Sequence, residues 1–303
     1  MNTVMVIISS YNGEKYIREQ IESIIRQSGI RTKIFVRDDG STDATIEILK
    51  KMQDNYDELI ISQGENIGWE QSFILALKSA PDAEYYAFCD QDDIWMPDKL
   101  INGVSKIRER EKLSSDKAIL YHCNKLSVDE DLKPLPHQVR RTPRPLNREN
   151  AMTQEYAQGC SIIINRQARN LVLRHIPNEQ IAHDFWTGLI CYMFGEIIYD
   201  DRRMFYHISH VRNASGEGHM LRSWHKRMIY FFSESPIYYR PWNDLLLGYH
   251  DLLSETDIVF INRLCIYKKS LKNKIYLLVS RKFVRDSIIG TVSLKVSILL
   301  NRL

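Results

Sequence analysis

The chain has 303 residues, of which 44% are apolar and 26% charged, as is typical of a soluble globular protein. This length suits one large α/β domain with an extension, or two modest domains. The net charge of +3 is unevenly divided: residues 265–303 hold nine basic side chains and one acidic one, a balance of +8.

The five cysteines are scattered and form no C-x-x-C pair, which argues against a disulfide framework and a zinc ribbon. No apolar stretch reaches the roughly 18 residues of a transmembrane helix. The N-terminal "VMVII" is too short for a signal peptide and has no basic flank. We therefore expect a cytoplasmic protein that does not span a membrane.

The first hundred residues alternate short β-rich runs with stretches of helical periodicity. Strands are expected at 3–9, 33–37, 58–62 and 85–89. Helices are expected at 14–28, 44–52 and 68–80. This alternation predicts an α/β fold with a mainly parallel sheet flanked by helices. Ligands of such sheets bind at the carboxyl ends of the strands, where "SSYNGE", "DDGS" and "DQDD" fall.

After about residue 115 the alternation loosens. The remaining expected elements are an irregular loop at 134–150, a strand running into a helix at 160–167, a helix at 183–195 and a hairpin at 196–209. From residue 223 the pattern is mostly helical. Residues 291–298 also alternate with period two, and we favour a helix over a strand there.

Three aspartates follow the apolar run 85–89 directly: Asp90, Asp92 and Asp93. Carboxylate oxygens are hard ligands suited to Mg²⁺ or Mn²⁺, which often bridge to substrate phosphates. The alternative is a solvated acidic turn before the next helix, which we expect to begin near Trp95 and Pro97. The position at the end of a buried strand favours the functional interpretation for Asp90 and Asp92, with Asp93 supporting the loop.

Two further strand ends carry candidate nucleotide contacts. Asp39, in "VRDDGST", is suited to accept hydrogen bonds from a nucleobase or a ribose, although an Asp-Gly turn explains the same residues. Tyr11, in "SSYNGE", offers a ring for stacking and is equally suited to pack under its loop.

Taken together, "VIISSYNGEKYIREQIESIIRQ", "VRDDGSTDAT", "ENIGW" and "AFCDQDDIWMPDKL" resemble, in order and spacing, the N-terminal half of glycosyltransferase family 2. The resemblance is close over residues 1 to about 105. It implies a GT-A fold, a nucleoside-diphosphate sugar donor, a Mg²⁺ or Mn²⁺ ion, and transfer with inversion.

The resemblance also implies roles for individual residues. The metal ligands would be Asp90 and Asp92. The nucleotide-sugar contacts would be Ser9, Tyr11, Asn12, Glu14, Asp39, Asn66 and Asp90.

An inverting transferase needs a carboxylate to deprotonate the acceptor hydroxyl. Asp184, in "AHDFW", begins an apolar stretch, where aspartate is also a favoured helix N-cap. Rhamnosyltransferase-like members carry a similar H-D-x-W after a "GC" step, so the resemblance assigns Asp184 as the base. It places His183, Trp186 and the Gly159–Cys160 step on the acceptor side, with core packing as the alternative for Trp186.

"YHISHVRNASG" resembles the family's Y-R-x-H-x-x-N-x-x-G stretch and aligns His210 with its histidine, a candidate metal or diphosphate contact. The alternative is a surface loop histidine. His207 stands where an arginine is more usual, which leaves Arg212 to supply a phosphate contact.

The basic C-terminal region fits either a solvated face or contact with anionic lipid. We favour peripheral binding at the inner face of the membrane, because family acceptors are often lipid-linked glycans. We expect no nucleic-acid partner, since no matching fold signature accompanies the charge.

We therefore expect a GT-A domain over residues 1–218, with a nucleotide-sugar-binding half at 1–115 and an acceptor-side half at 116–218. A helical basic extension would follow at 219–303. The predicted function is metal-dependent transfer of rhamnose or a hexose, from dTDP-rhamnose or a UDP-hexose, to a glycan or lipid-linked saccharide. The alternatives are a sugar nucleotidylyltransferase, disfavoured because "SSYNGE" replaces its phosphate loop, and a non-catalytic nucleotide-sugar-binding or scaffolding subunit.

Overall fold

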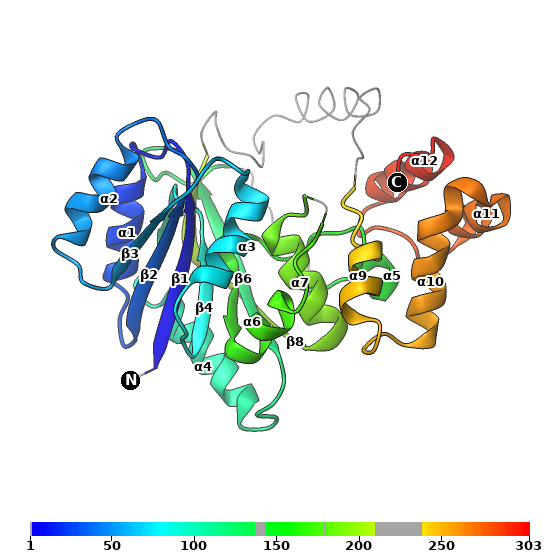
Figure 1. Cartoon of the computed structure of the whole chain (residues 1–303), viewed down its shortest axis with the longest axis horizontal. Helices are drawn as coiled ribbons and strands as arrows, with labels where there is room; N and C mark the ends of the chain where they lie inside the picture. Colours follow the sequence, from blue (N-terminus) through cyan, green and yellow to red (C-terminus); the bar gives the residue numbers. More distant parts are fainter. Residues whose placement is uncertain (1, 137, 139–142, 179, 210–237) are drawn as a thin grey trace. The chain divides into compact units, whose positions relative to one another are not determined.

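The computed structural model describes residues 2–136, 138, 143–178, 180–209 and 238–303 (Figure 1). The predicted metal contact His210, the phosphate candidate Arg212 and the expected domain boundary at 218 lie outside these residues. Within them, the chain groups into two compact units. The N-terminal unit comprises residues 1–143, 156–174 and 182–208, and the C-terminal unit comprises residues 144–155, 175–181 and 209–303.

The elements of both units follow in chain order. The strands are β1 (Thr3–Ser10), β2 (Arg31–Asp38), β3 (Leu59–Gln63), β4 (Tyr85–Cys89), β5 (Asp93–Trp95), β6 (Ile119–Val128), β7 (Ile163–Asn165) and β8 (Glu196–Ile208). The helices are α1 (Ile17–Ile25), α2 (Thr45–Gln53), α3 (Trp69–Ser79), α4 (Lys99–Glu111), α5 (Arg148–Ala151), α6 (Arg166–Leu173), α7 (His183–Phe194), α9 (Trp242–Tyr249), α10 (Glu255–Ile266), α11 (Leu271–Val279) and α12 (Ile288–Leu299). Two 3₁₀ turns are η1 (Gly159–Ser161) and η2 (Tyr267–Lys269).

The N-terminal unit is built on an eight-stranded sheet in the order β3-β2-β1-β4-β7-β6-β8-β5. The strands β1 to β4 run parallel to one another. β7 is antiparallel to β4 and β6, β8 is parallel to β6, and β5 closes the edge antiparallel to β8. The predicted fold class, a mainly parallel sheet flanked by helices, is confirmed.

Alternation along β1 explains the two helical layers. Val4, Val6 and Ile8 are fully buried in a core shared with α1, α2 and α4. Met5 and Ile7 point to the opposite face, which α3, α6 and α7 cover (Figure 1). Because both faces are covered, β1 reads as a continuous apolar run.

Two local predictions are wrong. Trp95 does not begin a helix: it ends β5, whose residues pair with β8 from Phe205 to His207. Residues 196–208 form one long strand instead of a hairpin. The "DDRR" step that suggests a turn is an irregularity in the pairing with β6, where the Asp200 carboxylate accepts hydrogen bonds from the backbone and guanidinium of Arg202.

The C-terminal unit is helical, as predicted, and α12 confirms a helix over the period-two alternation at 291–298. It also includes residues 144–155 and 175–181. These are attached by side-chain contacts: Asn150 Nδ2 donates to the carbonyl of Val284 at 2.6 Å, and His175 Nε2 lies 2.8 Å from Asp244.

Candidate functional site

The sheet register brings the polar strand ends of the N-terminal unit to one edge. Ser10 at the end of β1 lies opposite Asp38 in β2, and Ile8 lies opposite Cys89 at the end of β4. Ser9, Asp39 and the acidic loop after β4 therefore share the carboxyl edge of the parallel strands, as the sequence predicts.

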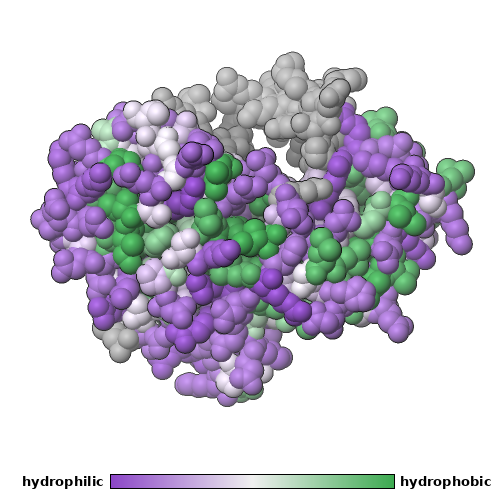
Figure 2. All heavy atoms as spheres, in the orientation of Figure 1, coloured by the Kyte–Doolittle hydropathy of each residue, from purple (hydrophilic) through white to green (hydrophobic). Residues whose placement is uncertain are grey.

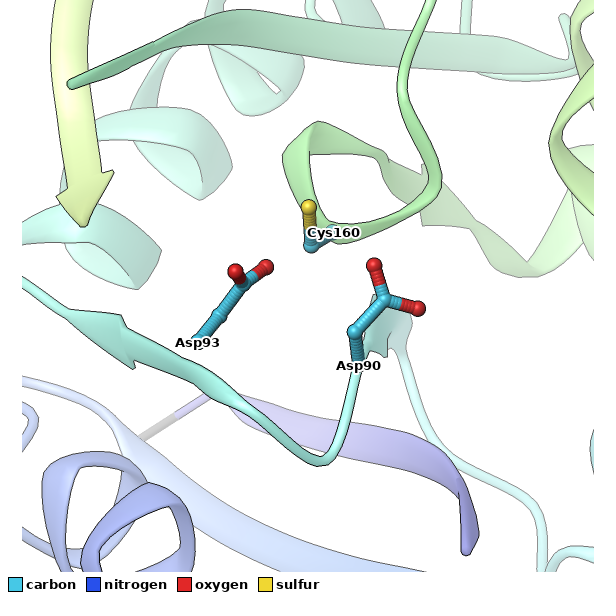
Figure 3. Close-up of side chains that lie close together, drawn as sticks. All are labelled: Asp90, Asp93 and Cys160. Atoms are coloured by element: carbon cyan, nitrogen blue, oxygen red, sulfur yellow. The ribbon is translucent and has the colours of Figure 1, made fainter. Parts of the chain in front are cut away.

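Asp90, Asp93 and Cys160 form the acidic centre of this edge. One ligand atom from each lies within 4.8 Å of the others, and the three side chains lie close together in Figure 3. Cys160 belongs to η1, which precedes the antiparallel strand β7 and is therefore carried to the end of β4. The amide of Phe88 donates to the carbonyl of Ile162 at 3.3 Å and fixes this approach.

Asp93 lies in the edge strand β5 and is fixed by the neighbouring strand β8. Its Oδ1 lies 2.9 Å from Nδ1 of His207, the residue opposite it in β8, and both side chains are buried. Its Oδ2 has no hydrogen-bond partner among the described oxygen and nitrogen atoms, although it is buried. Burial lowers the pKa of His207, but the hydrogen bond and charge of Asp93 outweigh it and the pKa is raised.

The cluster is electrostatically strained in a way that a cation would relieve. Burial, together with the charges of Asp93 and Asp92, raises the pKa of Asp90 well above its usual range. Burial and the neighbouring carboxylates of Asp93 and Asp90 likewise raise the pKa of the Cys160 thiol. The carboxylates of Asp90 and Asp93 fit a hard divalent ion such as Mg²⁺ or Mn²⁺, and the buried Oδ2 of Asp93 has no oxygen or nitrogen partner among the described atoms.

Asp184 reaches the same edge from the first turn of α7. Its Oδ2 accepts from the backbone N–H of Gly159 at 3.2 Å and its Oδ1 from that of Phe185 at 2.7 Å. The charge of Asp184 adds to the raised pKa of Asp90, after burial and the charges of Asp93 and Asp92. Because Gly159 directly precedes Cys160, a carboxylate held by backbone donors lies beside the acidic centre.

Gly159 is required by its close contact with His183. A Cβ at this position would lie 2.5 Å from Nε2 of His183. That imidazole is stacked on Phe73, with ring centroids 3.9 Å apart, and burial lowers its pKa to about 3. His183 is therefore a neutral ring within the core, and its contact with Gly159 sets how closely η1 packs against α7.

Trp186, one turn further along α7, is fully buried, and its indole N–H donates to the carbonyl of Val172 at 3.4 Å. Of the two interpretations open from the sequence, core packing describes this side chain. Neither His183 nor Trp186 presents its ring at the surface.

The loop after β1 is tied to the acidic loop. The Tyr11 amide donates to the Gln91 side chain at 3.0 Å, and the same side chain donates to the Tyr11 carbonyl at 3.1 Å. The Tyr11 ring is 46% exposed, so it is available for stacking. Ser9 donates its hydroxyl hydrogen to Ser72 at 2.6 Å.

Asn12 and Glu14 hold the start of α2 instead of extending into the site. Oδ1 of Asn12 accepts from the amide of Thr42 at 2.8 Å, and Oε2 of Glu14 accepts from that of Ala44 at 3.0 Å. Asn66 is exposed, with its backbone nitrogen 3.1 Å from where a Cβ on Gly40 would lie. Gly40 has φ of +80°, so this tight turn favours glycine.

Asp39 is buried and fully engaged. Its carboxylate accepts from the amides of Ile67 and Gly68, each at 3.0 Å, and forms an ion pair with Arg37. Arg37 was not among the residues predicted from the sequence. The available signal was a basic residue two positions before Asp39, directly after the apolar run 34–36.

The candidate metal ligands in the structure differ from those predicted from the sequence. The structure groups Asp93, expected only to support the loop, with Asp90, and it does not bring Asp92 into that group. His207, which the sequence marks only as a departure from a more usual arginine, lies beside this group through its hydrogen bond to Asp93. His210 lies outside the described residues.

A mainly parallel sheet with a carboxylate-rich site at the carboxyl ends of its strands defines an α/β protein of the nucleotide-binding kind. The sequence profile of glycosyl transferase family 2 matches residues 5–170, more than half of the chain, and the chain belongs to that family. The family expected from the sequence is confirmed.

Among curated proteins, the chain is similar to the dTDP-rhamnosyl transferase RfbG of Shigella flexneri, with 37% identity over 102 residues. That match covers 32% of this chain and about a third (35%) of the relative. It is also 34% identical over 192 residues to the Escherichia coli UDP-Glc:alpha-D-GlcNAc-diphosphoundecaprenol beta-1,3-glucosyltransferase WfaP, covering 63% of this chain and 71% of that protein.

Among solved structures, S. aureus TarS in complex with UDP is similar with a TM-score of 0.55 and 19% identity, covering 92% of this chain and 75% of that one. The mannosyltransferase PcManGT of Pyrobaculum calidifontis, in complex with GDP-Man and Mn²⁺, gives a TM-score of 0.53 at 16% identity. It covers 99% of this chain and 88% of that one. At these identities the likeness concerns the fold, and it agrees with the predicted GT-A architecture.

In the part of the chain that the structure describes, no helix combines the length and apolarity needed to cross a bilayer.

Proposed function

We propose that the chain is an inverting glycosyltransferase that moves a sugar from a nucleoside-diphosphate sugar to a hydroxyl of a glycan or lipid-linked saccharide in cell-surface polysaccharide synthesis. The observation that carries the proposal is the position of Asp184 beside the acidic centre: the N–H of Gly159 holds its carboxylate, and the next residue, Cys160, belongs to that centre. Family membership supports the reaction class.

The proposed donor is dTDP-rhamnose or a UDP-hexose. Two relatives support this pair, because one is described as a dTDP-rhamnosyl transferase and the other as a UDP-Glc-dependent glucosyltransferase. The exposed Tyr11 ring would stack on the nucleobase, and Ser9 would contact the nucleoside. The resemblance also assigns Asp39 to the nucleoside, although its buried carboxylate is already engaged by Arg37 and by the amides of Ile67 and Gly68.

Asp184 acts as the general base in this proposal. It takes the proton from the acceptor hydroxyl as that oxygen attacks the sugar carbon from the face opposite the diphosphate. The N–H groups of Gly159 and Phe185 orient the carboxylate, so little reorganisation is needed when the acceptor arrives.

Asp90 and Asp93 would hold a Mg²⁺ or Mn²⁺ ion, and Asp92 and His210 remain candidate ligands from the sequence. When bound, such an ion would offset negative charge on the departing nucleoside diphosphate. His207 fixes the Asp93 carboxylate through its hydrogen bond and keeps it aimed at the cluster.

We further propose that the enzyme works at the inner face of the membrane, where a lipid-linked acceptor would be presented. The balance of +8 in residues 265–303 supports attraction to anionic lipid.

Replacing Asp184 with Asn should lower the transfer rate by about 10²- to 10⁴-fold, because the amide cannot accept the proton. Donor binding should survive, since Asn keeps the size of the side chain. Transfer is measured with a radiolabelled donor, and binding by thermal shift with a panel of nucleotide sugars and Mn²⁺. Asp116→Asn, an exposed carboxylate, is the matched control.

A wild-type transfer rate in Asp184→Asn would show that the base is misassigned. In the thermal-shift panel, Asp93→Asn and Asp92→Ala separate the two candidate ligand sets. Loss of the Mn²⁺-dependent shift in Asp93→Asn alone would support the group that includes Cys160, and loss in Asp92→Ala alone would support the D-x-D assignment.

A further inference from the structure

The helix α11 in the C-terminal unit turns an apolar stripe outward. Leu271, Ile275 and Val279 are spaced four residues apart, so they lie on one face of the helix. All three are exposed, with Leu271 at 74% and Val279 at 70%. The buried side chain of this helix is Leu277, on the other side. This is the reverse of the usual pattern, in which the apolar stripe of a surface helix faces the core.

The helix α12 repeats the pattern. Ile288 and Val292 lie one turn apart and are exposed, Ile288 at 85%, while Leu294 and Ile298 are buried on the opposite side. Figure 2 shows hydrophobic side chains interspersed with hydrophilic ones over the C-terminal helices. Half of the exposed large apolar side chains among the described residues fall between residues 266 and 300: Ile266, Leu271, Ile275, Tyr276, Val279, Ile288, Ile289, Val292, Leu299 and Leu300.

Two lysines hold these helices together as an antiparallel pair. Lys274, near the start of α11, donates to the carbonyl of Leu299 at the end of α12 at 2.7 Å. Lys295 donates to the carbonyl of Leu277 at 2.6 Å and to that of Ser280 at 3.1 Å, at the end of α11. Positive charge at helix C-termini is stabilising. The two lysines therefore maintain the pair and present its outer side chains on a preformed scaffold.

Other basic residues surround the stripes and remain exposed: Lys268, Lys269, Lys272, Arg281 and Lys282. A helical pair with an apolar outer surface and flanking cations matches the surface of an anionic bilayer, which offers acyl chains beneath phosphate headgroups. A second copy of the chain fits less well, since a two-fold contact would place two surfaces of the same net positive charge against each other.

We propose that α11 and α12 form an in-plane membrane-docking element, with Leu271, Ile275, Val279, Ile288 and Val292 entering the headgroup–acyl boundary of an anionic bilayer. This inference rests on the membrane contact in the proposed function. It adds that a defined apolar surface inserts into the bilayer, beyond attraction between a charged tail and the lipid. The donor-binding edge belongs to other residues, so the two proposals fail separately.

The test is sedimentation of the full chain with vesicles of phosphatidylcholine alone or mixed with phosphatidylglycerol. The wild-type chain should bind the anionic vesicles. The double variants Leu271→Ser/Val279→Ser and Ile288→Ser/Val292→Ser should each bind at least about tenfold more weakly, because two buried apolar side chains are lost. Leu113→Ser removes an apolar side chain that is 80% exposed in the N-terminal unit and should bind like wild type.

A second measurement follows insertion directly. The emission of Leu271→Trp should shift to the blue on anionic vesicles, and that of Leu113→Trp should not. Lys269→Gln/Lys272→Gln should weaken binding and lower its salt dependence. Donor hydrolysis without acceptor should be unchanged in all these variants, which separates docking from catalysis.

The inference would be overturned if both double serine variants bound anionic vesicles as tightly as wild type does. It would also be overturned if the emission of Leu271→Trp did not shift on these vesicles. So would a wild-type chain that ignores anionic vesicles but forms a dimer that the serine variants abolish by light scattering. That result would assign the surface to contact between copies of the chain.

Discussion

His183 illustrates how a single side chain couples the core to the site edge. Its ring is buried against Phe73 and Phe88, and both ring nitrogens are without a hydrogen-bond partner among the described atoms. Burial therefore favours the neutral form and lowers the pKa to about 3. The neighbouring Asp184 is held by the amide of Gly159, whose missing Cβ makes room for this ring.

This burial predicts a dependence of stability on pH. The unfolded chain binds a proton on His183 below about pH 6.5, and the folded chain does not until about pH 3. The free energy of unfolding therefore falls as the pH falls through this window, by up to about 1.4 kcal/mol per pH unit. His183→Leu should remove this slope, measured by urea unfolding between about pH 6.5 and pH 5, above most carboxylate titrations.

His207 works in the opposite direction, because its raised pKa adds stability as the pH falls. The wild-type slope is therefore a net value, and the difference between wild type and His183→Leu isolates the buried ring. Equal slopes in the two proteins would mean that His183 is protonated in the folded state.

At the scale of single residues, some site residues could be predicted from the sequence and others could not. Asp90 and Asp184 are recognisable because each stands at the start or end of an apolar segment, and the structure brings them to one edge through the Gly159–Cys160 step. The contribution of Asp93 was not recognisable, since it depends on His207, more than a hundred positions away in the chain. The Asp39 carboxylate is engaged by Arg37, for which the only local sign was a basic residue two positions earlier.

At the scale of elements, the first half of the fold was predictable because each strand and helix there has one clear period. The strands β1 to β4 and the helices between them fall where the sequence predicts, with ends shifted by a few residues. The failures come from long-range pairing. β5 is three residues long and exists through its bonds to β8, and the "DDRR" step stays in one strand because β6 continues to pair beyond it.

The start of α4 contains an unusual buried cation. Lys99 is fully buried, its Nζ lies 3.6 Å from the centre of the Trp95 ring, and this nitrogen has no hydrogen-bond partner among the described atoms. Burial lowers the pKa of Lys99. A cation–π contact contributes about 0.5–2 kcal/mol, whereas a buried ammonium costs several kcal/mol unless it is paired.

Lys99→Met should therefore raise the free energy of unfolding by about 1–3 kcal/mol at neutral pH, because an apolar chain of similar length replaces the amine. The gain should shrink as the pH rises, since the depressed pKa makes the wild-type protein more stable towards alkaline pH. Lys112→Met, exposed at the end of α4, is the control. A less stable Lys99→Met would mean that the contact with Trp95 outweighs the cost of burial.

At the scale of the whole molecule, the two units do not divide at a single position such as residue 218, because the chain passes between them several times. The family profile extends to residue 170, yet residues 144–155 within it belong to the C-terminal unit. The guanidinium of Arg285 donates to the carbonyl of Thr153, and the Asp286 amide donates to Gln154 Oε1 at 2.9 Å. The C-terminal helices therefore complete the packing of a segment from the middle of the chain.

A chain ending at residue 208 should consequently lose the order of α5. Asn150 would lose its bond to the carbonyl of Val284, and Arg148 its ion pair with Asp257, so the helix of four residues has little left to hold it. Limited trypsin digestion should cleave after Arg148 much faster in the truncated chain than in the full one. Cleavage after Arg110 in α4, which lies in the N-terminal unit, is the internal control. If Arg148 stays equally protected in both chains, the segment is held by the N-terminal unit and the C-terminal helices are a separable extension.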